Sequence, residues 1–362
     1  MQIMEDRRAL HRIPEVGMDL PKTMAYLSEA LSGLDCRVFS PMENALCAFF
    51  DFGQDSAIAF RADCDALPVS EKNDVPYRSC HQGLMHACGH DGHMAILLEL
   101  ARRLNEKTEL PSNVLLLFQP GEETPGGALP LSQTGVLETY GVKAVFGLHL
   151  WPELPAGRMF SRANELMSRS SEVNVDVYGR SAHIGKAAEG LDSLSAAVQL
   201  YTRAMEMEKN LPDGVFRLLK FGRMESGTVR NALSAHTRLE GSLRAFQDEV
   251  FEGLRDGLLA IGRDVQQETG CTVDIQVAEG YRAVINPPAL YRKVADMMDL
   301  GELEEPSMTS EDFSFYQRRV PGLFMFLGVG NTSALHSDTF DFDEEILLKG
   351  ADFFEELAEK FQ

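Results

Sequence analysis

Residues 86–93 have the sequence His-Ala-Cys-Gly-His-Asp-Gly-His, and from Asp91 the chain continues into a helical pattern that extends to Asn105. A second helical pattern follows at Gly127–Thr139. Four apolar runs rich in strand formers lie on either side of these helices: Ala45–Phe52, Ala57–Ala62, Val114–Phe118 and Ala144–Leu150. Strands that alternate with helices predict a layered α/β sheet.

The pattern changes near residue 171. Strand-like alternation and one helical stretch follow, at Glu172–Tyr178, Asp192–Lys209, Thr237–Ala245 and Thr272–Val277. After Pro287 the chain returns to a helix, the apolar strand Leu323–Gly328 and a closing acidic helix from Asp343. This order predicts a discontinuous domain of residues 1–170 and 281–362, interrupted by an inserted α+β domain at residues 171–280.

Composition excludes several classes of partner. The 362 residues include 34 Lys+Arg and 55 Asp+Glu, and the resulting net charge of −21 repels nucleic-acid backbones and anionic membrane surfaces. No apolar run approaches the roughly 18 residues of a membrane span. The first residues lack the apolar segment of a signal peptide, and the six cysteines form no CxxC pair. We therefore expect a cytoplasmic protein that binds neither nucleic acid nor membranes.

The segment 86–93 is a candidate metal site. It holds three histidines and a cysteine in a chain with only nine histidines, and Gly89 and Gly92 give the backbone room to turn side chains inward. A Cys88 thiolate and a neutral His90 would suit zinc, or manganese if oxygen ligands dominate. The alternative is a surface loop that happens to be rich in histidine.

Two further segments follow strands of the same predicted sheet. Glu122 and Glu123 come after the strand that ends at Gln119, and His149 closes the strand from Ala144. Open α/β sheets bind ligands at these carboxyl ends. Of two adjacent carboxylates, one can bind a metal while the other acts as a general base. Taken singly, an acidic turn and a packed core histidine remain open alternatives.

Seven segments occur in an order that resembles a known family. They are His11–Glu15, Arg61–Pro68, Cys88–His90, Gln119–Glu123, His149–Pro152, Ser310–Phe313 and Leu335–Ser337. Together they resemble the aminoacylase, hippurate hydrolase and auxin-conjugate amidohydrolase branch of the dinuclear zinc-peptidase family that also contains the glutamate carboxypeptidases. The resemblance runs from about residue 11 to about residue 350. Each motif alone is weak, and the ordered set is specific.

The resemblance implies two divalent ions, zinc or manganese, and a general base at Glu122. The implied metal ligands are Cys88, His90, Glu123, His149 and His336. Cys88 is the preferred bridge between the ions, since a thiolate has the charge and lone pairs for it. Asp65 resembles the family's carboxylate that orients a ligand, with an ordinary strand-end aspartate as the alternative. The remaining histidines of this region are His81, His86 and His93. We interpret them as loop or packing residues, with a role in orienting a metal ligand as the alternative.

The inserted domain resembles the family's lid or dimerisation domain, which implies a homodimer. His183 corresponds to a histidine that reaches a neighbouring active site and polarises the scissile carbonyl. Asn231 and Arg244 fall where the family places groups that contact the substrate, and a guanidinium suits a free carboxylate. For each of the three, an exposed polar residue without such a role is an open alternative.

Two departures from the family pattern lie in this domain. Ala187 and Ala188 stand where the family commonly has Pro-His, and Asn231-Ala232-Leu233-Ser234 replaces Asn-x-Ile-Pro. Both leave the metal chemistry intact and put the choice of acyl group and amino acid in doubt.

These observations predict hydrolysis of the amide bond of a small N-acyl amino acid by a metal-activated water, with Glu122 as base. An alternative is dipeptidase or aminopeptidase-like activity with the same dinuclear chemistry, in which Glu311 and Asp312 would pair with a substrate ammonium. A third possibility is a metal-binding scaffold without catalysis. The retained Glu122 argues against the scaffold, because a structural metal has no use for a base.

Overall fold

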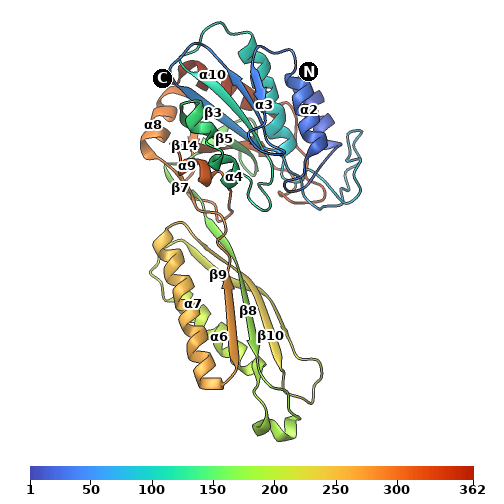
Figure 1. The fold of residues 1–362 in the computed structure, drawn as a ribbon, viewed down its shortest axis with the longest axis vertical. Coiled ribbons are helices and arrows are strands. Elements are labelled where there is room, and N and C mark those ends of the chain that lie inside the picture. Colours follow the sequence, from blue (N-terminus) through green and yellow to red (C-terminus); the bar gives the residue numbers. More distant parts are fainter. The chain divides into compact units, whose positions relative to one another are not determined.

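The computed structural model describes residues 1–362 and divides the chain into two compact units (Figure 1). The larger unit consists of Met1–Leu166, Val284–Pro306 and Asp312–Gln362. The smaller unit consists of Met167–Ala283 and Ser307–Glu311. Each unit has its own hydrophobic core.

The larger unit contains an eight-stranded mixed sheet, so the predicted α/β class is confirmed. Its strands, in spatial order, are β1 (Arg37–Phe39), β2 (Leu46–Phe50), β4 (Asn113–Gln119), β3 (Ala57–Asp63), β5 (Val142–Pro152), β14 (Gly322–Gly330), β6 (Met159–Ser161) and β13 (Leu300–Glu302). The central strands β4, β3, β5 and β14 are mutually parallel, whereas β2 and β6 pair with this block antiparallel. Every residue of β3 and β4 is buried, as expected for parallel strands covered on both faces.

Eight α-helices belong to this unit: α1 (Gln2–His11), α2 (Pro21–Leu31), α3 (His90–Asn105), α4 (Ala128–Gln133), α5 (Val136–Thr139), α8 (Pro288–Met297), α9 (Ser314–Gln317) and α10 (Ile346–Lys360). Helix α3 packs against α1, α10 and β3, so it is buried along most of its length. The single helix predicted at Gly127–Thr139 was wrong: α4 and α5 are separated by Gly135, whose φ of +78° interrupts the helix.

The register of the parallel strands brings their carboxyl ends together. Asp63 of β3 pairs with Gln119 of β4, and Arg61 of β3 pairs with Gly147 of β5. The segments that follow β3 and β4 therefore leave the sheet at one edge, next to the last residues of β5. His149 lies within β5, which continues to Pro152 rather than ending at Leu150.

The smaller unit is a four-stranded antiparallel sheet with two long helices on it. The strand order is β11 (Thr272–Val277), β8 (Arg169–Tyr178), β10 (His236–Ala245) and β9 (Arg217–Ser226). Helices α6 (Ser193–Lys209) and α7 (Asp248–Thr269) pack against the sheet. The sequence analysis did not predict β9 or α7, although the buried face of α7 has apolar residues at helical spacing: Phe251, Leu254, Leu258 and Val265.

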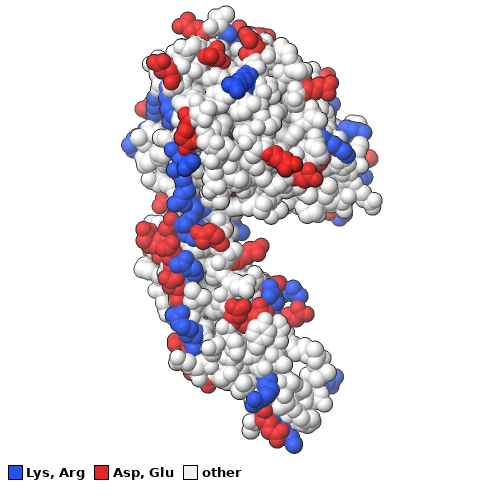
Figure 2. Space-filling model, viewed as in Figure 1, with Lys and Arg blue, Asp and Glu red and all other residues white.

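Smaller elements complete the chain: a two-stranded sheet of β7 (Asn164–Met167) and β12 (Val284–Asn286), and a 3₁₀ helix at Ile184–Glu189. No helix combines the length and apolar character that a bilayer crossing requires. On the face drawn in Figure 2, Lys and Arg lie close to Asp and Glu in many places. The acidic residues therefore do not form one continuous patch on this face, despite the negative net charge.

Candidate metal centre

The turn that carries Cys88 and His90 depends on glycine. Gly89 precedes α3 with a φ of +86°, a conformation that L side chains rarely adopt. A Cβ atom on Gly92 would lie only 2.8 Å from Cδ1 of Leu150. The two glycines therefore let the start of α3 approach the end of β5 closely enough for Cys88 to contact His149.

The five predicted ligands come together in two groups. Cys88 Sγ lies 3.4 Å from Nε2 of His149 and 3.3 Å from Nε2 of His336. His336 Nε2 in turn lies 3.2 Å from Oε1 of Glu123. Donor atoms of Cys88, His90 and His149 all lie within 4.8 Å of one another, and so do those of Cys88, Glu123 and His336. Cys88 is the member that the two groups share.

His336 reaches this cluster from a distant part of the chain. Its backbone N–H donates to the carbonyl oxygen of Ala87 at 2.8 Å, which ties its loop to the Cys88 segment. It has a φ of +65°, so the backbone adopts a rarely populated conformation in presenting this side chain. Strained residues of this kind cluster at functional sites.

Unpaired buried atoms show that these residues fit a metal ion. His90 Nδ1 lies 2.8 Å from the carbonyl oxygen of Asp65, whereas its Nε2 is buried without a hydrogen-bond partner. Oε1 of Glu123 is also buried and forms no hydrogen bond, although His336 Nε2 lies 3.2 Å away. Buried polar atoms normally have partners, so a cation bound here would satisfy both. Sulfur, imidazole nitrogen and carboxylate oxygen are the donors that zinc prefers.

The electrostatics of the cluster favour a cation. Burial lowers the pKa of His90, but the carboxylates of Asp63 and Asp65 outweigh it and raise that pKa to about 10. Burial and the nearby Glu123 raise the pKa of the Cys88 thiol well above its ordinary value. The His149 pKa lies well below its ordinary value, because the ring is buried and faces His93. The carboxylates around the cluster would favour a bound divalent ion in place of the protons on His90 and Cys88.

Asp65 orients the turn that carries the two glutamates. Its Oδ1 accepts the backbone N–H of Glu122 at 2.8 Å, and its Oδ2 accepts that of Glu123 at 3.0 Å. Its backbone carbonyl contacts His90, as described above. Glu122 is buried, with its donor atom in one group with those of His90 and Glu123. Asp65 thus touches three of the predicted site residues.

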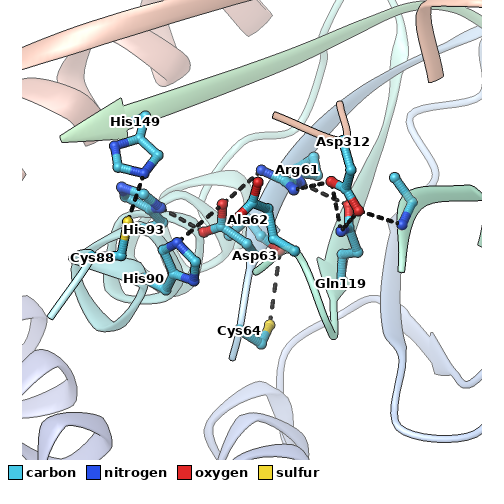
Figure 3. Close-up of polar contacts among 12 residues, drawn as sticks. Arg61, Ala62, Asp63, Cys64, Cys88, His90, His93, Gln119, His149 and Asp312 are labelled. Carbon is cyan, nitrogen blue, oxygen red and sulfur yellow. Dashed lines mark hydrogen bonds and ion pairs between the residues drawn. The ribbon is translucent and has the colours of Figure 1, made fainter. Parts of the chain in front are cut away.

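A buried charge network beside the cluster was missed from the sequence. Arg61 donates to Asp63 Oδ2 at 2.7 Å, to Gln119 Oε1 at 2.8 Å and to Asp312 Oδ1 at 2.8 Å (Figure 3). The second oxygen of Asp312 accepts the N–H of Ala128 at 2.8 Å. The available signal was Arg61 itself, because a charged residue inside an apolar strand requires buried partners.

The other histidines of this region differ in their contacts. His81 is anchored through Nδ1 to the carbonyl oxygen of Pro14 at 2.6 Å, in agreement with its interpretation as a loop residue. His86 is buried, with both ring nitrogens lacking a hydrogen-bond partner. His93 is also buried but has partners for both nitrogens.

The three residues predicted to contact substrate lie in the smaller unit. His183 caps the 3₁₀ helix, with its Nδ1 accepting the N–H of Gly185 at 3.1 Å, and it is adjacent to Asn231 through the bond from Ile184 N to Asn231 O at 3.0 Å. Arg244 is half-buried near the carboxyl end of β10. Its hydrogen bonds go to neutral oxygens, the Met308 carbonyl at 2.5 Å and the Ser242 hydroxyl at 3.2 Å.

The departure at Ser234 has a structural explanation. Its hydroxyl donates to the carbonyl oxygen of His236 at 2.8 Å and accepts from the hydroxyls of Ser193 at 2.9 Å and Ser226 at 2.8 Å. A hydroxyl network therefore holds this loop where the family commonly has proline.

Comparisons with known proteins bear on the family and the fold. The model of peptidase family M20/M25/M40 matches residues 59–360. An uncharacterized hydrolase of Staphylococcus saprophyticus is 32% identical, over 99% of this chain and 97% of its own length. A dinuclear metal-binding M20 peptidase of Bacillus subtilis is 28% identical, with a TM-score of 0.86 over 99% of this chain and 96% of its own. A candidate aminohydrolase from methicillin-resistant Staphylococcus aureus is 26% identical, with a TM-score of 0.91 over the same shares.

Proposed function

The chain belongs to peptidase family M20/M25/M40 and is a metal-dependent hydrolase of that family, and from this premise we propose that it hydrolyses the amide bond of N-acyl amino acids. One observation carries the proposal: two groups of potential ligands share Cys88, and the buried carboxylate of Glu122 lies beside them. A shared ligand would hold two ions close together, and a candidate base beside them suits hydrolysis by a metal-activated water.

Cys88, His90 and His149 would hold one ion, and Cys88, Glu123 and His336 would hold the other, so Cys88 would serve both. Cysteine and histidine favour zinc, whereas the carboxylate also permits manganese. When bound, the ions would acidify a water molecule and polarise the carbonyl group of the substrate. The larger unit is the catalytic domain in this proposal.

Glu122 accepts the proton of the attacking water and returns it to the departing amine. Two features prepare it for this role: its backbone N–H is fixed by Asp65, and its side chain is buried, which limits competing contacts with bulk water. Glu123, the next residue, is held by the other oxygen of Asp65 and faces His336 instead. Neighbouring carboxylates thus have separate roles.

The smaller unit supplies substrate contacts in this proposal. Burial lowers the pKa of Arg244, and its hydrogen bonds to neutral oxygens leave its charge uncompensated. A half-buried guanidinium without a negatively charged partner suits the free carboxylate of an acyl amino acid. Asn231 and His183 would contact the amide, with His183 polarising the carbonyl in the active site of a partner subunit.

A homodimer through the smaller unit is supported by two adjacent surfaces. Strand β9 is an edge of its sheet, so one side of it is open for pairing. Helix α6, which packs on β9, exposes an apolar stripe at helical spacing formed by Leu194, Val198 and Tyr201. Pairing of β9 with β9 and α6 with α6 would cover both surfaces. We also place the protein in the cytoplasm, in keeping with six unpaired cysteines.

The rival dipeptidase or aminopeptidase-like activity requires a carboxylate for the substrate ammonium. Asp312 does not serve this purpose, because it is fully buried and its oxygens bond to Arg61, Gln119 and the Ala128 N–H. This occupancy removes Asp312 as the ammonium partner, so the alternative rests on Glu311, which is also buried.

A substrate panel tests the proposal. The purified chain, loaded separately with Zn²⁺ and Mn²⁺, is incubated with N-acetyl amino acids and with dipeptides that carry the same carboxyl-terminal residue. We expect turnover of the N-acyl compounds, abolition by a chelator, and little turnover of the dipeptides. Preferential cleavage of the dipeptides would contradict the assigned substrate class.

A further inference from the structure

His93 uses both ring nitrogens inside the protein. Its Nδ1 lies 2.5 Å from Oδ1 of Asp63, and its Nε2 accepts the backbone N–H of Leu150 at 2.9 Å. Figure 3 shows the ring between Asp63 and the strand that carries His149. We propose that His93 is a positioning residue: it holds His149 in place to bind an ion together with Cys88 and His90. This inference rests on the proposed two-ion site.

The sheet explains why this position needs a side chain. Strand β3 pairs with β5 only as far as Arg61 and Gly147, and no strand lies beside β5 on this side beyond that point. The N–H of Leu150 would therefore lack a partner directly after His149. The imidazole of His93 takes the place of the missing strand, and its centroid lies 4.6 Å from that of His149 in an edge-to-face arrangement.

The partners of His93 define its tautomer. Because the N–H of Leu150 is a donor, Nε2 must be the acceptor, and the ring proton resides on Nδ1 and points to Asp63. Asp63 is fixed in turn by Arg61, so a continuous set of buried contacts runs from β3 to the end of β5. Leu150, which His93 anchors through its N–H, also contacts Nδ1 of His149 through its carbonyl oxygen at 2.7 Å, and such contacts orient a metal ligand.

The same residues do not form a third metal site. Donor atoms of Asp63, His90 and His93 lie within 4.8 Å of one another. However, both nitrogens of His93 are occupied, and the oxygens of Asp63 bond to His93 and Arg61. Only Nε2 of His90 is unpartnered, and it is already assigned to the ion beside Cys88.

Three variants separate positioning from packing. His93→Leu removes both hydrogen bonds, whereas His93→Gln retains an amide that can donate to Asp63 and accept from Leu150. His86→Leu is the matched control, because His86 is an equally buried histidine of the same segment whose ring nitrogens have no partners. Each protein is dialysed against a series of fixed free Zn²⁺ concentrations, and bound zinc per chain is measured with the melting temperature of the metal-free form.

We expect His93→Leu to hold one of its two ions about 10–100-fold more weakly than the parent chain, the usual cost of losing such a contact. His93→Gln should recover most of the affinity, and His86→Leu should bind both ions as the parent does. In Co²⁺-loaded protein, the thiolate charge-transfer band should change in His93→Leu and return in His93→Gln.

The outcomes distinguish this inference from the proposed function. A parent chain that binds fewer than two ions would overturn both. Two ions bound as tightly in His93→Leu as in the parent would overturn the role of His93 alone. So would an equal loss of affinity in His86→Leu, or a failure of His93→Gln to recover any affinity while its metal-free form melts like the parent.

Discussion

The interiors of the two units are built differently. Beneath the candidate site, the larger unit buries Arg61, Asp63 and Asp312 completely. In the smaller unit, the space between sheet and helices is filled by apolar side chains such as Val175 and Leu258. Its buried Arg169 pairs with Asp248, whose side chain is 47% exposed, and its candidate substrate residue His183 is exposed. Buried charges usually lower stability relative to an apolar core. The contrast indicates that the larger unit buries both members of its ion pairs beneath the candidate site, whereas the ion pair of the smaller unit reaches solvent.

The largest effect should come from Glu122→Gln. This change keeps the shape of the side chain and removes the base, so kcat should fall by about 10²–10⁴-fold with both ions retained. Steady-state kinetics with an N-acetyl amino acid, together with metal analysis of the same sample, provide the test. Full activity in this variant would refute the assigned role.

Replacement of Arg61 should produce the next largest effect. Arg61→Met leaves Asp63 and Asp312 buried without their cation, so the free energy of unfolding should fall by about 3–5 kcal/mol. Urea unfolding followed by the fluorescence of Trp151, which is the only tryptophan and lies in the larger unit, measures it.

A matched change in the smaller unit provides the control for Arg61→Met. Leu258→Ala should cost about 2–5 kcal/mol through a cavity. It should leave metal affinity unchanged, whereas Arg61→Met should weaken it. If the two variants weakened metal binding equally, the contrast between the units would be lost.

The fold class and the membership of the family were predictable from the sequence for physical reasons. Buried parallel strands such as Val114–Phe118 appear as continuous apolar runs, and strand ends position ligands at one edge. The helix prediction from Asp91 to Asn105 agrees with α3, because its apolar periodicity is strong. Strand β9 was missed, since its exposed charged and polar residues obscure the alternation.

The candidate site was only partly predictable. The sequence indicated Cys88 and Glu123 as members of a site, and the structure brings them together. The role of Arg61 was not predicted, and a ligand-orienting role for His93 was only an alternative, because each depends on partners that the register of β3, β4 and β5 brings close. Spacing along the chain contains no information on such contacts between distant residues.

The two units should also differ in their response to acid. Burial would raise the pKa of Asp63, but His90 and Arg61 hold it well below its ordinary value, and Arg7 and His11 do the same for Asp91. A depressed pKa contributes stability that is present above the unfolded value of about 3.9 and is lost as the pH falls through the folded value. In the smaller unit, the partly exposed Asp248 has a pKa lowered by Arg169 and Arg282.

In metal-free protein below about pH 4, the larger unit should therefore lose more stability. Trp151 fluorescence should change at a higher pH than that at which α6 and α7 lose hydrogen-exchange protection. Earlier loss of protection in α6 and α7 would reverse the order that this comparison predicts.

The smallest effect concerns the cap of α6. The Asp192 side chain accepts from the N–H groups of Leu194 and Ser195 at 3.1 and 3.3 Å. Asp192→Ala should destabilise the smaller unit by about 1 kcal/mol, and Asp192→Asn should restore most of it. Hydrogen exchange of the α6 amides would show the loss, while zinc affinity should stay unchanged. Weaker zinc binding in Asp192→Ala would mean that the units are not energetically separate.

Anomalous diffraction from crystals of the zinc-loaded chain would test the central claim most directly. We predict two peaks about 3.5–4 Å apart, with Sγ of Cys88 about 2.3 Å from each. His90 and His149 should coordinate one ion, and Glu123 and His336 the other. A single peak, or two peaks of which one lies beyond reach of Cys88, would contradict the shared-ligand site.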